Sequence, residues 1–208
     1  MKRQRSKVFD ETCDHYMEQI RSMDFIAKCG PLGAEQDGEG LLIKLYDDVY
    51  RVDAQRISAL DGREVVPAVK VMICMYVLTC PAPLPQLDEN LATFREFQNS
   101  APLVSYFTNN TNKTLESHFS GNIHGLKKRS MNIGGELLES KTHDVSLRFY
   151  AFPRIPVLLN FNDRDELFPA SCSILYHKSA ALFLDMECLA MTATLLSGKL
   201  LGQPQQEL

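Results

Sequence analysis

The sequence predicts an α+β fold in which antiparallel or mixed β-sheet elements pack with several helices, as a single compact domain over residues 1–208. Three observations favour this fold class. Some segments place apolar residues at three- and four-residue steps, as amphipathic helices do. Other segments alternate apolar and polar residues, as half-buried strands do. With 45% hydrophobic residues, the chain can also bury a sizeable core.

The N-terminal segment is predicted to form one amphipathic helix. An apolar stripe runs from Phe9 to Ala27 at helical spacing. We expect Gly30-Pro31 to end this helix, because glycine tolerates a left-handed cap and proline cannot continue the hydrogen-bond ladder. The basic residues ahead of the stripe are not followed by the apolar run of a secretory signal. Residues 1–7 are therefore predicted to be a flexible, solvated tail.

An antiparallel meander is predicted next. Residues 41–45 and residues 49–53 alternate with period two, and Asp47-Asp48 between them suits a tight turn. A short third strand is expected around Ile57. These segments should form hairpins, because each follows the last after only a few residues.

A buried helix and an extended connection follow the meander. Nearly every residue from Val65 to Leu78 is apolar, and Pro67 stands where a first helical turn tolerates a missing donor. Residues 81–90 begin with three prolines in five positions, which remove donors and fix φ, so this stretch should run extended. We interpret it as an internal connection within one domain; a domain boundary is the alternative.

The second half of the chain is predicted to contain both helices and strands. The segment 155–161 is almost wholly apolar, so we expect a strand at the centre of its sheet. Asp185 can cap a last helix, since its carboxylate can accept a hydrogen bond from the first turn. The other expected elements are a helix that contains Leu115 and Phe119, a helix over 123–133 ended by Gly134-Gly135, and a strand over 145–149.

Composition and charge exclude some classes of binding partner and indicate a cellular location. The formal net charge is -4 and the acidic residues are spread out, so we expect no nucleic acid and no anionic lipid as partner. The longest apolar run, Val71 to Leu78, is far shorter than the roughly 20 residues that span a bilayer, so no membrane segment is expected. Six cysteines without a secretory signal predict reduced thiols and a cytoplasmic location.

The sequence contains none of the common motifs that hold a metal or cofactor. The cysteines include no Cys-x-x-Cys pair, and the histidines include no two at a helical step. A Walker loop, a dinucleotide glycine fingerprint and a serine nucleophile elbow are also missing from the sequence. No catalytic residue, metal or cofactor is therefore assigned.

The acidic loop after the predicted central strand is the sharpest candidate for a ligand-binding site. Asp163, Asp165 and Glu166 could bind a hard cation through oxygen or act as an acid and base pair. Such a site needs further groups from elsewhere, and Asp144 and Glu96 are the ones that suggest themselves. The alternative is a solvated turn in which aspartates cap backbone donors.

A second candidate for ligand binding is Arg95-Glu96, which two phenylalanines bracket. The guanidinium of Arg95 could bind an anionic group. The alternative is that Phe94 and Phe97 enter the core while Arg95 and Glu96 pair outside it. We expect the acidic loop and this segment near the functional surface.

Six short motifs stand in a characteristic order along the chain. They are Phe94-Arg95-Glu96, Gly134-Gly135, Asp144 before a strand, Phe152-Pro153-Arg154-Ile155-Pro156, Asp165-Glu166 with Phe168-Pro169, and Leu184-Asp185-Met186-Glu187. Together they resemble an uncharacterised domain-of-unknown-function family from anaerobic bacteria and archaea, which sometimes stands C-terminal to an iron–sulfur cluster domain. The resemblance implies a cytoplasmic setting in anaerobic redox metabolism and an iron–sulfur protein as partner, and it assigns no catalytic residue. The chain departs from the family pattern at His143 and at 160–162, beside the acidic loop.

The main functional hypothesis is a non-catalytic binding or accessory module in anaerobic redox metabolism. The alternative is a divalent-metal-assisted hydrolase that uses Asp144, Asp163, Asp165 and Glu166. A homo-oligomeric scaffold, whose apolar surface a second copy covers, is the third possibility.

Overall fold

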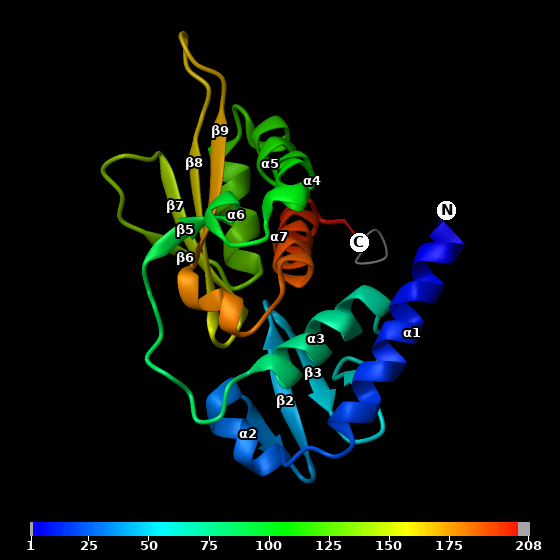
Figure 1. Ribbon diagram of the computed structural model, residues 1–208. Coiled ribbons are helices and arrows are strands. Elements are labelled where there is room, and N and C mark those ends of the chain that lie inside the picture. The colour runs from blue at the N-terminus through cyan, green and yellow to red at the C-terminus, as the bar shows by residue number, and fades with distance from the viewer. Residues whose placement is uncertain (1, 204–208) are drawn as a thin grey trace.

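The computed structural model describes residues 2–203, with side chains described from Glu11 onward, and it confirms a single compact α+β domain. Figure 1 shows two antiparallel sheets that meet near the middle of the molecule, with helices packed against each. The buried apolar side chains of both sheets belong to one continuous core.

The first sheet contains the predicted antiparallel meander and one further strand, β1, that was not predicted. Its strands lie in the order β1-β2-β3-β4, with Leu41 opposite Val52. Alternate residues of β2 are buried while Lys44 is exposed, as the period of two predicts. The elements of this half are α1 (Lys2–Ile20), α2 (Phe25–Leu32), β1 (Glu35–Asp37), β2 (Gly40–Leu45), β3 (Asp48–Val52), β4 (Ile57–Ala59) and α3 (Pro67–Thr79).

The single N-terminal helix predicted from the apolar stripe is two helices. A new helix begins after Asp24, whose side chain accepts a hydrogen bond from the amide of Ala27 at 3.1 Å. Gly30 and Pro31 lie inside α2, and the left-handed cap is Gly33 with φ 65°. Helix α1 begins at Lys2, so residues 2–7 of the predicted tail are helical, while Met1 lies outside the described residues.

The second sheet has the order β5-β9-β8-β7-β6, which puts β8 at its centre as predicted. Its strands are β5 (Leu91–Thr93), β6 (Glu136–Leu138), β7 (Val145–Phe152), β8 (Ile155–Asn162) and β9 (Ser171–His177). The short edge strands β5 and β6 were not predicted. Strand β9 was not predicted either, although Cys172, Ile174 and Tyr176 alternate along it and are buried.

Helices cover one face of this second sheet, as Figure 1 shows. Helix α7 is capped by Asp185, which accepts a hydrogen bond from the amide of Cys188 at 2.7 Å, and it ends at Gly202 with φ 72°. The helical elements are η1 (Phe94–Glu96), η2 (Ala101–Leu103), α4 (Val104–Asn110), α5 (Asn112–Phe119), α6 (Ile123–Asn132), η3 (Lys178–Leu182) and α7 (Met186–Leu201).

The two sheets are joined by the β2–β3 turn as well as by the connection at 81–90. At this turn Tyr46 is buried with φ 56°, and its hydroxyl donates to the carbonyl oxygen of Thr192 at 2.8 Å. The amide of Tyr46 donates to the carbonyl oxygen of Ala151 at 3.0 Å. Arg154 makes a further link, because its guanidinium donates to the carbonyl oxygen of Pro31 at 3.0 Å. Polar groups from both halves therefore meet at the junction.

The cysteines lie mostly inside the core. Within residues 2–203 no disulfide joins any of the six, and all but Cys29 are buried. Among the helices of the same residues, none combines the length and the apolar character needed to cross a membrane.

Candidate functional site

The acidic loop lies at the tip of the β8–β9 hairpin, which projects past the helices at the top of Figure 1. Beside this loop lies a hollow of about 550 Å³. Asp144, Asp163 and Asp165 line it, together with Lys113 and Glu116 from α5. We call this the acidic hollow.

The acidic hollow unites some of the predicted site residues and leaves others apart. Asp144, which precedes β7, lies beside Asp163 because β7 and β8 pair so that Val145 is opposite Phe161. Glu166 is exposed and does not line the hollow. Arg95 and Glu96 lie in η1 and do not line it either.

Asp165 fixes the shape of the hairpin tip. One of its carboxylate oxygens, Oδ1, accepts hydrogen bonds from the amides of Leu167 and Phe168, both at 2.7 Å. The amide of Asp165 donates to the carbonyl oxygen of Phe168 at 3.0 Å, which closes the turn. An aspartate that binds backbone groups two and three residues ahead is a common turn-forming device. Hydrogen bonds among its own residues therefore close the turn at the tip.

Asp163 and Asp144 tie the start of the β8–β9 loop to its surroundings. Oδ1 of Asp163 accepts hydrogen bonds from the amide of Gly121 at 2.6 Å and from the amide of Arg164 at 2.8 Å. Gly121 has φ 76°, a left-handed conformation that favours glycine. Oδ2 of Asp144 accepts a hydrogen bond from the amide of Asp163 at 2.8 Å. The loop between α5 and α6 is thereby fastened to the hairpin.

Sequence reasoning missed two residues of the hollow, Lys113 and Glu116. Oε1 of Glu116 accepts a hydrogen bond from the amide of Cys172 at 3.0 Å, and its Oε2 pairs with Nζ of Lys113 at 2.8 Å. Lys113 and Glu116 are three residues apart on α5, which is the usual spacing of an ion pair on a helix. Their place beside the hairpin depends on how α5 packs on β9, for which the sequence carries no local signal.

The three aspartate carboxylates of the hollow are each partly occupied by hydrogen bonds. Each of the three aspartates gives one oxygen to backbone amides, and within residues 2–203 its second oxygen has no hydrogen-bond partner. In the same residues no three His, Cys, Asp or Glu side chains are arranged so that they could hold a metal ion. The hollow therefore presents three aspartate carboxylates beside the Lys113–Glu116 ion pair.

Two large apolar side chains stand beside this charge. Leu167 is 82% exposed and Phe168 is 67% exposed, and Phe168 also lines the hollow. Both lie in the loop that the hydrogen bonds of Asp165 close. Adjacent exposed apolar side chains on a projecting element are typical of interaction surfaces.

Two residues of the Phe94-Arg95-Glu96 segment, Phe94 and Glu96, have local structural roles. Oε2 of Glu96 accepts hydrogen bonds from the amide and the hydroxyl of Thr93, both at 2.7 Å, and these bonds lower the pKa of Glu96. Phe94 is buried and stacks on Phe107 with ring centroids 4.4 Å apart. Glu96 therefore stabilises the start of η1 as part of a capping box.

A family model described as Domain of unknown function (DUF3786) matches residues 24–199, which is most of the chain. The chain belongs to the DUF3786 family. No curated protein and no solved structure matches it.

The DUF3786 match begins at Asp24, the cap of α2, and ends in α7. It therefore contains both sheets, the acidic hollow and the projecting hairpin. Helix α1 lies outside the matched region, although Met17 and Ile20 on it are buried in the core. In this chain the DUF3786 region is thus extended by a helix that packs against α3.

Proposed function

We propose that this chain is a protein-binding module of the DUF3786 family that docks its partner on the β8–β9 hairpin. The observation that carries the proposal is the pair Leu167 and Phe168, 82% and 67% exposed, beside the carboxylates of the acidic hollow. The partner surface that fits has an apolar patch for this pair and basic side chains for the carboxylates.

Three properties of the hairpin support a docking role. Its tip is organised before binding by the bonds of Asp165, which lowers the entropy lost on association. Its aromatic ring offers apolar area at small conformational cost. The second oxygens of Asp144 and Asp163 are available to a basic partner, and such charges raise the association rate and select the partner.

An iron–sulfur protein in cytoplasmic, anaerobic redox metabolism is the partner class that we propose. The family resemblance supports this choice. An accessory module of this kind needs no catalytic residue of its own, which is consistent with aspartates whose oxygens hold a loop together.

A photo-reactive phenylalanine analogue in place of Phe168 tests the proposal. In the cells that make the protein, illumination should produce one dominant covalent adduct with a second protein, which mass spectrometry then identifies. The same analogue at Leu60, which is 57% exposed in the turn that follows β4 of the first sheet, is the control and should not yield that adduct.

Three results would contradict the proposal. One is the absence of an adduct at 168, and another is the same adduct from position 60. The third is an adduct of twice the chain's mass, because it would identify a second copy as the occupant and favour the homo-oligomeric scaffold. Where a partner is found, Asp144→Asn should weaken its binding, and the weakening should shrink as salt rises.

A divalent-metal-assisted hydrolase is the second candidate. The observation that favours it is that Asp144, Asp163 and Asp165 line one hollow. Against it, each aspartate already holds backbone amides with one oxygen. The hydrolase requires that a cation bind through the remaining oxygens, which is measurable as a change in thermal stability.

A further inference from the structure

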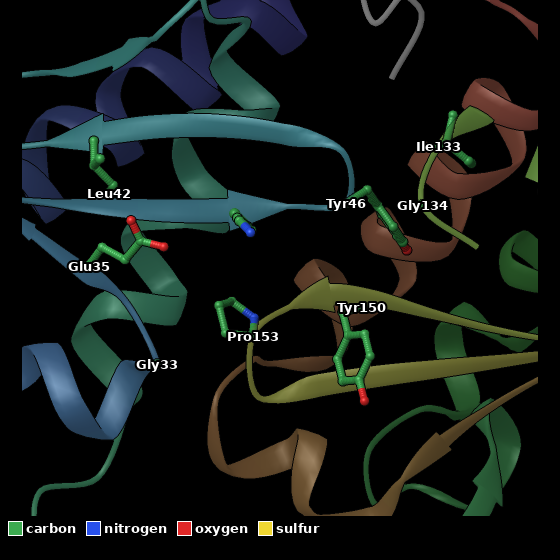
Figure 2. Close-up of a pocket in the computed structure, with 9 residues that line it drawn as sticks. Gly33, Glu35, Leu42, Tyr46, Ile133, Gly134, Tyr150 and Pro153 are labelled. Carbon is green, nitrogen blue, oxygen red and sulfur yellow. The ribbon is translucent and has the colours of Figure 1, made fainter. Parts of the chain in front are cut away.

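A second cavity, of about 330 Å³, lies where the two sheets meet. Glu35, Leu42 and Lys44 of the first sheet line it, and Ile133, Tyr150 and Pro153 line it from the second half of the chain. Figure 2 shows Glu35 and Leu42 on neighbouring strands and Tyr150 and Pro153 on the other side of the cavity. We call this the junction cavity. It is separate from the acidic hollow, with which it shares no lining residue.

The strand register brings two opposite charges to the junction cavity. Glu35 lies opposite Leu42 in the ladder between β1 and β2, and Lys44 is two residues further along β2. Residues that lie opposite each other or two apart share one face of a sheet. The other face of β2, with Leu41, is buried in the core. The carboxylate and the ammonium group therefore belong to the face that borders the cavity.

Three polar groups at the cavity have no hydrogen-bond partner in the part of the chain that the structure describes. Within residues 2–203, the carboxylate of Glu35, the ammonium of Lys44 and the hydroxyl of Tyr150 make no hydrogen bond and no ion pair. Nearby charges of the same sheet are paired, since Arg51 lies 2.7 Å from Asp37. An acid, a base and a hydroxyl thus remain available around one cavity.

The remaining wall is apolar. The side chains of Leu42, Ile133 and Pro153 and the ring of Tyr150 supply it. A mainly apolar wall with a few polar groups is the usual composition of a small-molecule site. Such sites range upward from about 300 Å³, so this cavity suits a ligand much smaller than a nucleotide.

We infer that the junction cavity binds a free α-amino acid with an apolar side chain. Its carboxylate pairs with Lys44, its ammonium group pairs with Glu35, and its side chain packs against Leu42, Ile133 and Pro153. A free amino acid carries its carboxylate and its ammonium group on the same carbon atom. These two charges complement the ammonium of Lys44 and the carboxylate of Glu35, which stand on neighbouring strands. Because the cavity is lined from both sheets, the bound ligand stabilises the junction and raises the melting temperature.

Titration with three related probes tests this inference. L-phenylalanine carries both charges, phenethylamine lacks the carboxylate, and 3-phenylpropionate lacks the ammonium group. With the ¹⁵N-labelled full chain, L-phenylalanine should shift the amide signals of Glu35, Lys44 and Tyr150 and raise the melting temperature. Each single-charge probe should bind about tenfold more weakly, because it loses one charge-assisted hydrogen bond.

Two variants and their controls connect the result to the named residues. Lys44→Gln and Glu35→Gln should each weaken L-phenylalanine about tenfold, while leaving the single-charge probe that does not need the lost charge unaffected. Lys141→Gln and Glu39→Gln, which remove exposed charges outside the cavity, should bind as the unaltered chain does. Dispersed amide spectra verify that each variant is folded.

Three outcomes would overturn the inference. The first is no signal change around the cavity at about 10 mM L-phenylalanine, well above a millimolar dissociation constant. The second is equal binding of all three probes, or binding unaffected by both variants. The third is equal binding of the dipeptide Phe-Gly, since that would make a peptide terminus the ligand.

Discussion

Nζ of Lys199 lies 2.6 Å from Oδ2 of Asp48 and joins α7 to the start of β3. The pair is largely buried, because the two side chains are 9% and 12% exposed. Lys199 also lies 2.6 Å from Asp47, and Arg63 pairs with Asp48 from the other side. This charge network holds the β2–β3 turn, with Tyr46 at its tip, against the second half of the molecule.

Because of this network, the free energy of unfolding should depend on pH in the acidic range. Burial alone would raise the pKa of Asp48, but hydrogen bonds from Lys199 and Arg63 outweigh burial and lower it below the usual 3.8. A carboxyl with a lowered folded-state pKa stabilises the fold above its unfolded pKa, and this stabilisation is lost as the pH falls through the folded value. Urea unfolding at about pH 7, 5 and 3 should show that Asp48→Asn loses less stability below pH 5 than the unaltered chain.

The matched control for that experiment is Glu64→Gln, an exposed carboxyl nearby. It should follow the pH profile of the unaltered chain. An Asp48→Asn profile parallel to that of the unaltered chain over the whole range would show that the pair with Lys199 does not govern acid stability.

The hydroxyl of Tyr46 gives a second prediction. Tyr46→Phe removes the hydrogen bond to the carbonyl oxygen of Thr192 while keeping the buried ring. We expect the free energy of unfolding to fall by about 1 kcal/mol, the typical net contribution of one hydrogen bond. Urea unfolding measures it, and Tyr150→Phe is the control, because the hydroxyl of Tyr150 has no partner within residues 2–203. Equal effects of the two substitutions would refute the assigned role.

Elements with strong local signals could be predicted from the sequence. Helix α3 begins at Pro67 as expected, because a missing donor is harmless in the first turn. The β2–β3 hairpin follows from alternation, although its tight turn is Tyr46-Asp47, and Asp48 already pairs with Leu45. A tyrosine with φ 56° in that turn could not be foreseen, because contacts distant in sequence hold it there: its burial, its hydroxyl bond to Thr192 and its amide bond to Ala151.

The acidic loop could be chosen from the sequence, but its surroundings could not. Asp163, Asp165 and Glu166 follow an apolar strand, and such a pattern predicts a polar loop whatever the fold. Glu116 reaches it only through tertiary packing, since its carboxylate accepts from Cys172, 56 residues away. The missed break between α1 and α2 has a different cause, because the apolar stripe continues across it and hides the local N-cap at Asp24, where α2 begins.

The hairpin tip should depend on the carboxylate of Asp165. Asp165→Ala removes the acceptor of the amides of Leu167 and Phe168, so hydrogen exchange of these amides should accelerate about tenfold. Asp165→Asn keeps an oxygen acceptor and should leave the rates nearly unchanged. The amide of Ile174 in β9 serves as the internal reference. Unchanged rates in Asp165→Ala would contradict a turn held by this side chain.

The thiols should differ in reactivity. Burial raises the pKa of Cys80, Cys172 and Cys188, and a hydrogen bond with Cys13 together with burial raises the pKa of Cys74. A thiol must ionise to react, so these groups should be protected in the folded chain. Cys29 is half-buried, and we expect it to react first with a disulfide reagent. Cys29→Ser should abolish the fast phase; a fast phase that survives would place the reactive thiol elsewhere.

Divalent cations should leave the fold's stability unchanged. In the acidic hollow the aspartates hold backbone amides, and within residues 2–203 no set of three ligating side chains is arranged for a metal. A cation present at 100 times its dissociation constant would add about 2.7 kcal/mol of stability, which a thermal scan detects readily. We therefore expect the same melting temperature with and without millimolar Mg²⁺, Mn²⁺ or Ca²⁺. A rise in the unaltered chain that Asp144→Asn abolishes would instead support the hydrolase, because that substitution keeps the loop's hydrogen-bond acceptor and removes only the charge.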